Sequence, residues 1–519
     1  MQRELQQTPP SDGASVSYDL REWQKGYRSL PEEYDYWIDE IAGKIPEELN
    51  GTLFRNGPGL LDVNGQRIHH PFDGDGMVCA FTFSGGRVHF RNRFVRTQPF
   101  VEEQKAGKIL YRGVFGTQKP GGWLANALDL RLKNIANTNI LYWGDKLLAL
   151  WEAAEPHRLS PNTLETIGLD YLDGALQPGS AFAAHPRIDP ACEFDQGQPR
   201  LVNFAISPGL STTIRLYEFN CSGKLVQKQT HAVPGFAFMH DFAITPHYCI
   251  FFQAPMSFNP IPFVMGMRGA GQCLQVQPNQ PTQVIIIPRY GSEPVRIIPV
   301  KAGFVFHHAN AFEQDGLLYV DSICYADFPT IDPHQDYRDV QFSLLAPGQL
   351  WRFQFDLNSQ TVEQHLMESR CCEFPVVHPE YVGRDYRYVY LGAGHSAEGN
   401  APLQALLKLD VISGDRQIWS AAPHGFTGEP IFVPRPQTGS HGISNNGPSN
   451  NGPSNNGQAE DDGWLLTLTF NGQLERSQLV IHDAQDIREP LAKLTLKHHV
   501  PYGLHGSFVP QCFLSENIV

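Results

Sequence analysis

Four histidines occupy apolar stretches far apart along the chain, and imidazole is the side chain that most often binds metal ions. Their surroundings read Ala184-His-Pro, Met239-His-Asp-Phe, Phe306-His-His-Ala-Asn and Leu504-His-Gly. In the third stretch His307 and His308 are neighbours, so a strand would turn them to opposite faces. The local pattern leaves open which of the two faces a metal. One histidine in such a stretch is usually a core residue, whereas the whole set predicts a metal site.

Three glutamates, Glu152, Glu373 and Glu429, lie in equally apolar surroundings. A buried, unpaired carboxylate is costly, so each should have a partner such as the second ring N–H of a metal-binding histidine. Four neutral imidazoles without a thiolate suit iron(II) better than zinc and leave open coordination positions for oxygen. These seven residues therefore predict one Fe(2+) per chain, with the glutamates offsetting its charge.

A repeated strand pattern can bring these distant residues together. The chain has 519 residues, 41% hydrophobic and 18% charged, with 47 glycines and 40 prolines, a composition typical of many strands and turns. An alternating strand, a polar turn and a second alternating strand recur at 81–90, 157–166, 216–225, 286–292, 351–358, 406–414 and 479–485. Seven such hairpins predict an all-β, seven-bladed β-propeller. Each blade then contributes one of the seven residues, and the inner strands converge on the axis.

Two segments lie outside the predicted propeller, which spans residues 51–519. Residues 1–50 form an N-terminal extension, with a helical pattern over 31–42 that is expected to pack on the propeller wall. Residues 440–462 contain a Ser-Asn-Asn-Gly-Pro repeat with almost no apolar side chains, which predicts a disordered loop insertion.

Charge and cysteine content exclude other classes. A formal net charge of −14 without any basic block argues against a nucleic-acid partner. Nine scattered cysteines without a C-x-x-C spacing are typical of reduced thiols in a cytoplasmic protein. The first twenty residues have no apolar signal region, and the chain has no uninterrupted apolar stretch of the roughly 18 residues that cross a membrane.

Two apolar stretches are candidates for peripheral membrane contact, Trp123–Leu132 and Phe258–Met267. The first has apolar residues at helical spacing. Core burial is the alternative. An exposed patch rimmed by Arg131, Lys133 and Arg268 would instead indicate a helix lying in the membrane interface.

At these motifs the chain resembles the carotenoid cleavage oxygenases over nearly its whole length. The stretches that carry the resemblance are Phe54-Arg-Asn-Gly-Pro-Gly, His70-Pro-Phe-Asp-Gly-Asp-Gly-Met, Ala184-His-Pro-Arg-Ile-Asp-Pro, Phe236-Ala-Phe-Met-His-Asp-Phe, Glu373-Phe-Pro, Gly428-Glu-Pro-Ile-Phe-Val and Gly503-Leu-His-Gly-Ser. The family implies a seven-bladed propeller under a dome of loops and short helices, with axial Fe(II) held by His185, His240, His307 and His505. Its outer carboxylates fall on Glu152, Glu373 and Glu429. Glu373 is expected to hold His307 and Glu429 to hold His505, and the resemblance pairs Glu152 with His240.

The implied substrate is a long, rigid and apolar polyene, which needs an apolar, aromatic tunnel. Trp151, Phe306, Phe374 and Tyr325 lie beside or near the metal-site residues in sequence, and the resemblance adds Phe72, Phe115 and Thr138. Ordinary core packing is the alternative for each. Stilbene-cleaving relatives place a lysine where Thr138 stands, so the threonine favours a carotenoid-type substrate.

The resemblance therefore implies a non-haem Fe(II) dioxygenase that cleaves the central 15,15′ double bond of apocarotenals with O2, giving retinal-type aldehydes. No catalytic residue beyond the metal site is needed, because no acid, base or nucleophile takes part. The alternatives are a stilbene-cleaving oxygenase or polyene isomerase on the same scaffold, or a non-catalytic, metal-stabilised propeller that binds lipids. The expected location is cytoplasmic, with peripheral membrane association.

Overall fold

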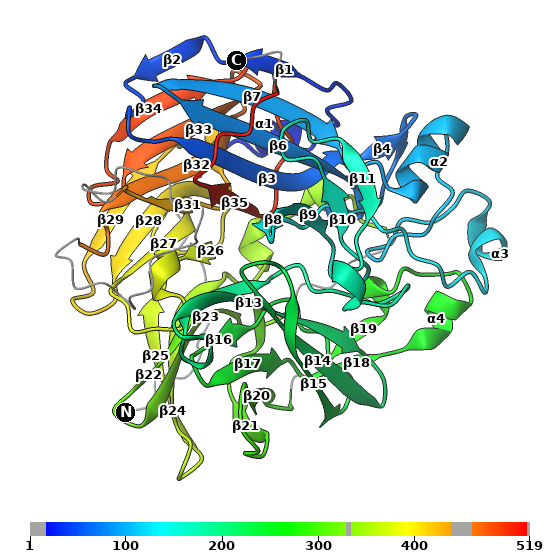
Figure 1. Cartoon of the computed structure of the whole chain (residues 1–519). Coiled ribbons are helices and arrows are strands. Elements are labelled where there is room, and N and C mark those ends of the chain that lie inside the picture. Colours follow the sequence, from blue (N-terminus) through cyan, green and yellow to red (C-terminus); the bar gives the residue numbers. More distant parts are fainter. Residues whose placement is uncertain (1–16, 278, 329–333, 437–458, 516–519) are drawn as a thin grey trace.

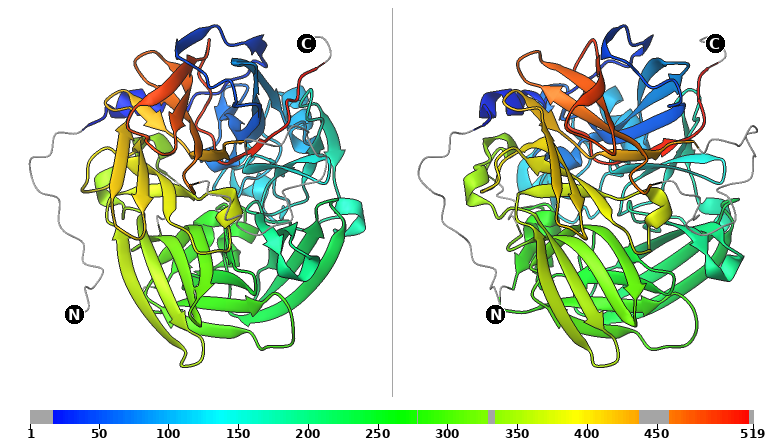
Figure 2. Two further views of the ribbon diagram at one scale, coloured as in Figure 1. Left: turned by 60° about the vertical axis from the view of Figure 1, so that its left-hand side comes forward. Right: turned by 90° about the vertical axis from the view of Figure 1, so that its left-hand side faces the viewer.

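The computed structural model describes residues 17–277, 279–328, 334–436 and 459–515. Within them, seven sheets of four to six strands stand around a common centre as the blades of a β-propeller (Figure 1 and Figure 2). The fold predicted from the sequence is confirmed. Each predicted hairpin falls on an antiparallel strand pair in the outer part of its blade, and in blades one and seven one further strand lies outside that pair.

From the axis outward, blade one contains β35 (Gly506–Val509), β3 (Gly51–Leu60), β6 (Asp75–Ser84), β7 (Arg87–Phe94) and β1 (Asp35–Trp37). Blade two contains β8 (Asn139–Trp143), β9 (Lys146–Leu150), β10 (His157–Leu159) and β11 (Thr166–Leu169). Blade three contains β12 (Arg187–Cys192), β13 (Gln198–Ser207), β14 (Ser211–Asn220) and β15 (Leu225–Pro234). Blade four contains β16 (Ala243–Ile244), β17 (Tyr248–Gln253), β20 (Thr282–Pro288) and β21 (Arg296–Val300).

Blade five contains β22 (Phe304–Gln314), β23 (Leu317–Tyr325), β24 (Gln349–Asp356) and β25 (Thr361–Glu368). Blade six contains β26 (Cys372–Val376), β27 (Tyr388–Gly394), β28 (Leu403–Asp410) and β29 (Arg416–Ser420). In blade seven, β30 (Gly425–Thr427) and β31 (Ile431–Pro434) both pair with β32 (Gly463–Asn471), followed by β33 (Arg476–Asp483), β34 (Pro490–Thr495) and β2 (Glu40–Gly43). Outside the blades lie β4 (Asp62–Val63), β5 (Gln66–Arg67), β18 (Met256–Phe258), β19 (Leu274–Val276), and the helices α1 (Leu20–Lys25), α2 (Gln98–Ala106), α3 (Gly122–Asn126) and α4 (Pro260–Val264).

Apolar side chains on both faces of the blades hold the ring together. Successive residues of a strand point to opposite faces. In β20, Val284 and Ile286 therefore pack against blade five, while Ile285 and Ile287 pack against blade three. Among the described residues, an apolar cluster of this kind lies between each pair of neighbouring blades. Each fully buried side chain of this size contributes about 1.5–3 kcal/mol. A strand such as β20, which neighbouring blades cover on both faces, therefore requires an uninterrupted apolar run.

The last strand closes the ring. β35 pairs antiparallel with β3, with Val509 opposite Thr52 and Gly506 opposite Arg55. Residues near the C-terminus thus complete the blade that residues near the N-terminus begin, as the order of the hairpins predicts. His505, just before β35, is thereby brought to the axis.

The N-terminal segment differs from its prediction. The helix expected over 31–42 is wrong, because this region contains β1, which pairs with β7, and β2, which pairs with β34. These two strands complete the outer edges of blades one and seven, so residues 35–43 belong to the propeller rather than to a separate extension. The short helix lies earlier, at α1. Most of the insertion predicted at 440–462 lies outside the described residues.

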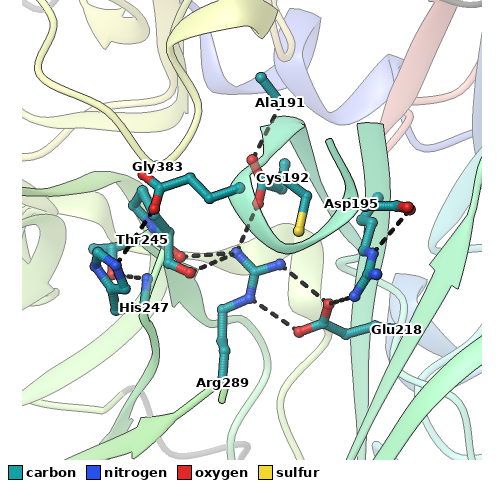
Figure 3. A network of polar contacts seen from close by, with 12 residues as sticks. Ala191, Cys192, Asp195, Glu218, Thr245, His247, Arg289 and Gly383 are labelled. Atoms are coloured by element: carbon teal, nitrogen blue, oxygen red, sulfur yellow. Dashed lines mark hydrogen bonds and ion pairs between the residues drawn. The ribbon is translucent and has the colours of Figure 1, made fainter. Parts of the chain in front are cut away.

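A buried arginine joins blades three and four just after β20. The guanidinium of Arg289 donates to Glu218 of β14 at 3.0 Å, to Asp189 of β12 at 2.8 Å and to the backbone carbonyl of Thr245 at 2.9 Å (Figure 3). Asp189 also accepts from Arg384 of the β26–β27 connection, at 2.9 Å. A buried charge is tolerated when it is paired in this way. The network holds the inner strand β12 at Asp189, four residues after His185. Four extended residues span about 13 Å.

Candidate metal centre

Four histidines from four blades meet near the axis of the ring. One ligand atom of each lies within 4.8 Å of the others: His185, His240, His307 and His505. Three of them stand just before the inner strands β12, β16 and β35, and the fourth lies within β22. The propeller thus brings together every histidine predicted for the site.

The adjacent histidines of β22 have separate environments. The pairing of β22 with β23 shifts register on both sides of His308, and His307 is the residue that joins the cluster. The backbone N–H of His308 instead donates to Asp241 at 2.8 Å, and its ring Nδ1 lies 2.8 Å from the Ser322 hydroxyl. Burial lowers the pKa of His308 to about 4, so its ring is neutral near pH 7.

Three of the four imidazoles have a carboxylate at Nδ1. The distances are 2.6 Å from Glu152 to His240, 2.5 Å from Glu373 to His307 and 2.7 Å from Glu429 to His505. The pairs of Glu373 with His307 and of Glu429 with His505 are those expected from the sequence, and the pair of Glu152 with His240 is the one that the family resemblance implies. A carboxylate that accepts the Nδ1 proton fixes the tautomer and leaves the Nε2 lone pair free for a metal. No carboxylate among the described residues forms such a contact with His185.

The inward-facing nitrogens fit a cation. Nε2 of His185 lies 2.8 Å from Nε2 of His240. Nε2 of His307 is buried and has no hydrogen-bond partner among the described residues. Buried polar atoms are nearly always partnered, and a shared metal ion would satisfy several nitrogens at once. The four-histidine cluster therefore fits a non-haem metal site.

Burial and charge keep two of these rings neutral. Burial, reinforced by the neighbouring histidines, pushes the pKa of His185 well below its usual value. Burial also lowers the pKa of His505, although Glu429 opposes the shift. For His307 burial again acts downward, but the Glu373 carboxylate and its hydrogen bond outweigh burial and raise the pKa. By raising the pKa of His307, Glu373 makes this ring a stronger base, and its hydrogen bond also fixes the ring's orientation. The neutral form of the ring is the one that binds metals.

An apolar cavity of about 190 Å³, partly open to solvent, leads to the cluster. Its walls include all seven tunnel residues predicted from the sequence: Phe72, Phe115, Thr138, Trp151, Phe306, Tyr325 and Phe374. His240, His307 and His505 also face it, so the cavity reaches the proposed metal position directly.

An irregular stretch of backbone sets the orientations of Glu373 and Phe374. The pairing of β26 with β27 shifts register after Glu373, and Phe374 has a positive φ of 54°. A bulky residue rarely adopts this conformation. Here it lets the Phe374 backbone N–H donate to the Glu373 carboxylate at 2.6 Å while its ring lies 5.5 Å from that of His307. Strain of this kind is concentrated at functional sites.

Sequence reasoning does not find three further wall residues, Asn137, Phe238 and Leu504. Phe238 and Leu504 stand within two residues of a predicted metal ligand, so proximity along the chain is the signal that could have found them. Asn137 is not close in sequence to a predicted metal ligand. In the structure its side-chain amide donates to the backbone carbonyls of residues 72 and 74.

The two apolar stretches proposed for membrane contact lie side by side around α3 and α4 (Figure 1). The helix predicted over 123–132 ends at Asn126, yet Trp123, Leu124 and Leu128 are exposed, as are Ile261, Met265 and Met267. The prediction that Lys133 rims this patch is wrong. Lys133 is buried and pairs with Asp75 at 2.7 Å and Glu103 at 2.6 Å. None of the helices in the described residues has the length and apolar character needed to cross a membrane.

The family profile named for RPE65, the retinal pigment epithelial membrane protein, matches residues 27–510. The chain belongs to the RPE65/carotenoid oxygenase family. It is 57% identical to the apocarotenoid-15,15′-oxygenase of Synechocystis sp. over 96% of this chain and 98% of that protein. It is 29% identical to the isoeugenol monooxygenase of Pseudomonas nitroreducens over 92% of this chain and 96% of that one. A solved structure of the cobalt-substituted Synechocystis enzyme superposes with a TM-score of 0.90 at 57% identity, covering 95% of this chain and 100% of that one.

Proposed function

We propose that this member of the carotenoid oxygenase family is a non-haem iron(II) dioxygenase that cleaves the central 15,15′ double bond of apocarotenals. The observation that carries the proposal is the aromatic cavity that ends at the four-histidine cluster. The 57% identity to an apocarotenoid-15,15′-oxygenase supports the same substrate class.

Four residues would hold the ion, namely His185, His240, His307 and His505. An all-imidazole set without thiolate favours iron(II) over zinc. When bound, iron(II) supplies the redox-active centre that dioxygen chemistry requires. The three glutamates hold the proton at Nδ1 of their histidines, keep each ring oriented and offset the positive charge.

The side chains of the cavity bind and position the polyene. Its wall has seven phenylalanine, tyrosine and tryptophan rings: Phe72, Phe115, Trp151, Phe238, Phe306, Tyr325 and Phe374. Flat, apolar walls exclude water and restrict a rigid chain to one position, so that one double bond among many lies nearest the cluster. The reaction adds both atoms of O2 across one C=C bond, which breaks to give two aldehydes. The alkene supplies the electrons, so no other reductant is required.

Composition of the cavity wall favours this substrate over a hydroxylated stilbene. No lysine or arginine is among the residues that line the described cavity. The hydroxyl of Thr138 is already committed to Asn137 at 3.1 Å. A phenol or catechol group would therefore bind without a cationic partner, whereas a hydrocarbon polyene needs none.

The test of this activity is iron loading without oxygen, followed by mass spectrometry of the products formed from apocarotenals and hydroxystilbenes under ¹⁸O₂. We expect a retinal-type aldehyde and a shorter dialdehyde, each with one labelled oxygen, and little product from the stilbenes. Labelled phenolic aldehydes from stilbenes alone would refute the proposed substrate. A geometric isomer without oxygen incorporation would refute cleavage.

We also propose that the exposed side chains around α3 and α4 contact a membrane, where such substrates dissolve. Arg112 stabilises the base of this patch, because its buried guanidinium donates to the backbone carbonyls of Asp129 at 2.6 Å and Arg268 at 2.8 Å. Arg131 and Arg268 are exposed beside the apolar side chains. Exposed apolar groups rimmed by cations are typical of interfacial contact.

Vesicle sedimentation tests this contact. The double variant Leu124→Gln/Leu128→Gln should lose about tenfold or more in affinity for vesicles of mixed neutral and anionic lipids, because a buried leucine contributes about 1.5–3 kcal/mol. The double variant Leu210→Gln/Ile412→Gln is the control, since both side chains are similarly exposed in turns of other blades. Equal losses in the two variants would refute the proposed patch.

A further inference from the structure

The three glutamates of the metal centre are held by different partners. Glu152 is half-buried and contacts His240. Glu373 also accepts from the Tyr325 hydroxyl at 2.8 Å and from a backbone N–H. Glu429 accepts from the guanidinium of Arg55 at 2.5 Å and from the Gly506 N–H at 2.9 Å. Among the described residues, Arg55 is the cation that forms an ion pair with one of the three.

Arg55 contacts the region around His505 at two points. Its Nη1 donates to the Glu429 oxygen that His505 does not use. Its Nη2 donates to the backbone carbonyl of Leu504 at 2.9 Å. One planar guanidinium therefore fixes both the carboxylate that orients His505 and the backbone of the residue before it. Arginine can do this because its donors form a rigid fork.

The backbone around Arg55 is pressed against the same loop. The Asn56 N–H donates to the His505 carbonyl at 2.8 Å, and the Leu504 N–H donates to the Asn56 carbonyl at 2.9 Å. A Cβ on Gly506 would lie 2.6 Å from Cδ of Arg55, and one on Gly57 would lie 2.6 Å from the Gly503 backbone. Glycines are needed at this approach because any side chain would push the two segments apart. The Phe54–Gly59 motif thus holds the backbone of residues 503–506, which carries His505.

We propose that Arg55 is a positioning residue of the metal centre, acting on His505 through Glu429. The inference rests on the proposed metal site but is independent of the substrate. It differs from a purely structural role in ring closure, which would change the stability of β3 and β35 without altering how the metal is bound.

Two substitutions separate the effect of the guanidinium's charge from the effect of its paired N–H donors. Arg55→Gln removes the charge and should weaken iron(II) affinity, measured by chelator competition, by about tenfold or more, the usual effect of changing an outer partner of a metal site. Arg55→Lys keeps the charge but cannot reach both acceptors, so its loss of iron(II) affinity should be smaller than that of Arg55→Gln. X-ray absorption at the iron edge should show a wider spread of iron–nitrogen distances in both.

Arg352 provides the matched control. Its Nε and Nη2 donate to Asp321 of β23 at 2.8 and 2.7 Å, in a largely buried pair that contacts neither the histidines nor the glutamates of the centre. Arg352→Gln should reduce the free energy of unfolding and leave iron affinity and the absorption spectrum unchanged. Unchanged iron binding in both Arg55 variants would overturn the inference. A parent chain that binds no iron would overturn the metal centre itself.

A double variant covers the case in which Arg55→Gln leaves Glu429 unpaired and the chain does not fold. In Arg55→Met/Glu429→Gln neither group is charged. The contact through Glu429 is already altered in Glu429→Gln, so the double variant additionally loses only the bond from Arg55 to the Leu504 carbonyl. Its iron affinity should therefore lie within about threefold of that of Glu429→Gln alone. A further tenfold loss would show that Arg55 acts independently of Glu429 and would refute the inference.

Discussion

Replacing Glu373 with glutamine separates the charge of a carboxylate from its hydrogen bonds. The His307 Nδ1 and the Phe374 N–H both contact one oxygen of Glu373, at 2.5 and 2.6 Å. Tyr325 donates to the other oxygen at 2.8 Å. A glutamine amide can place its oxygen at the first position and its NH2 at the second, where the tyrosine hydroxyl can turn and accept. All three contacts can persist, so the variant loses mainly the negative charge.

The expected loss of iron(II) affinity in Glu373→Gln is about 10–100-fold, the usual effect of altering an outer partner, or about 1.4–2.7 kcal/mol. Glu373→Ala removes the hydrogen bonds as well and should reach or exceed the upper value. The pH dependence has a defined sign. Glu373 raises the pKa of His307, so at lower pH a larger fraction of His307 is protonated in the parent chain than in the variant. A metal ion must displace that proton in order to bind. The difference in affinity should therefore narrow as the pH falls.

Chelator competition for iron(II) under anaerobic conditions measures these affinities directly. Glu368→Gln is the control, because Glu368 is also a buried carboxylate but pairs with Arg416 at 2.6 Å, on the outer strands. It should leave iron affinity unchanged. Equal affinities of Glu373→Gln and the parent chain would refute the role given to this carboxylate, and a difference that widens at low pH would refute the electrostatic argument.

Three further outcomes are expected. His240→Ala should abolish iron retention, measured as bound iron per chain, with little change in melting temperature; retained stoichiometric iron would contradict the site. Lys133→Met leaves Asp75 and Glu103 as unpaired buried carboxylates and should cost about 3–5 kcal/mol of unfolding free energy by denaturant titration, whereas an unchanged midpoint would show that the cluster is not stabilising. Deletion of 444–457 should leave turnover near that of the parent chain, and a large loss would show that this segment supports activity.

The parts of the structure that the sequence predicts are those that burial constrains most. Runs such as Val284–Ile287 must be apolar on both faces because neighbouring blades cover both, and this regularity indicates the propeller. A glutamate beside an apolar strand needs a partner, so the sequence alone is enough to single out Glu152, Glu373 and Glu429. The choice between His307 and His308 is different. It depends on an irregular register in β22, which local alternation does not encode and which only the resemblance to a family could supply.

The wrong predictions involve residues whose partners are distant in the chain. In the segment 31–42, Tyr34, Tyr36 and Ile38 fit a strand spacing as well as a helical one, and the free outer edges of β7 and β34 decide in favour of strands. The sequence favours a surface position for Lys133 because lysine is usually exposed. Its burial depends on Asp75 and Glu103, which no local pattern connects to it.

The odd number of blades explains the asymmetry of the metal centre. Glu373 and His307 come from blades six and five, Glu429 and His505 from blades seven and one, and Glu152 reaches His240 from blade two to blade four. These pairs use six blades, so the histidine of blade three, His185, has no carboxylate partner in the part of the chain that the structure describes. Burial and the neighbouring histidines push the pKa of His185 well below its usual value, whereas Glu373 raises the pKa of His307 despite burial. The ring therefore presents the metal with donors of unequal basicity, and His185 is the weakest base among those whose pKa shifts are resolved.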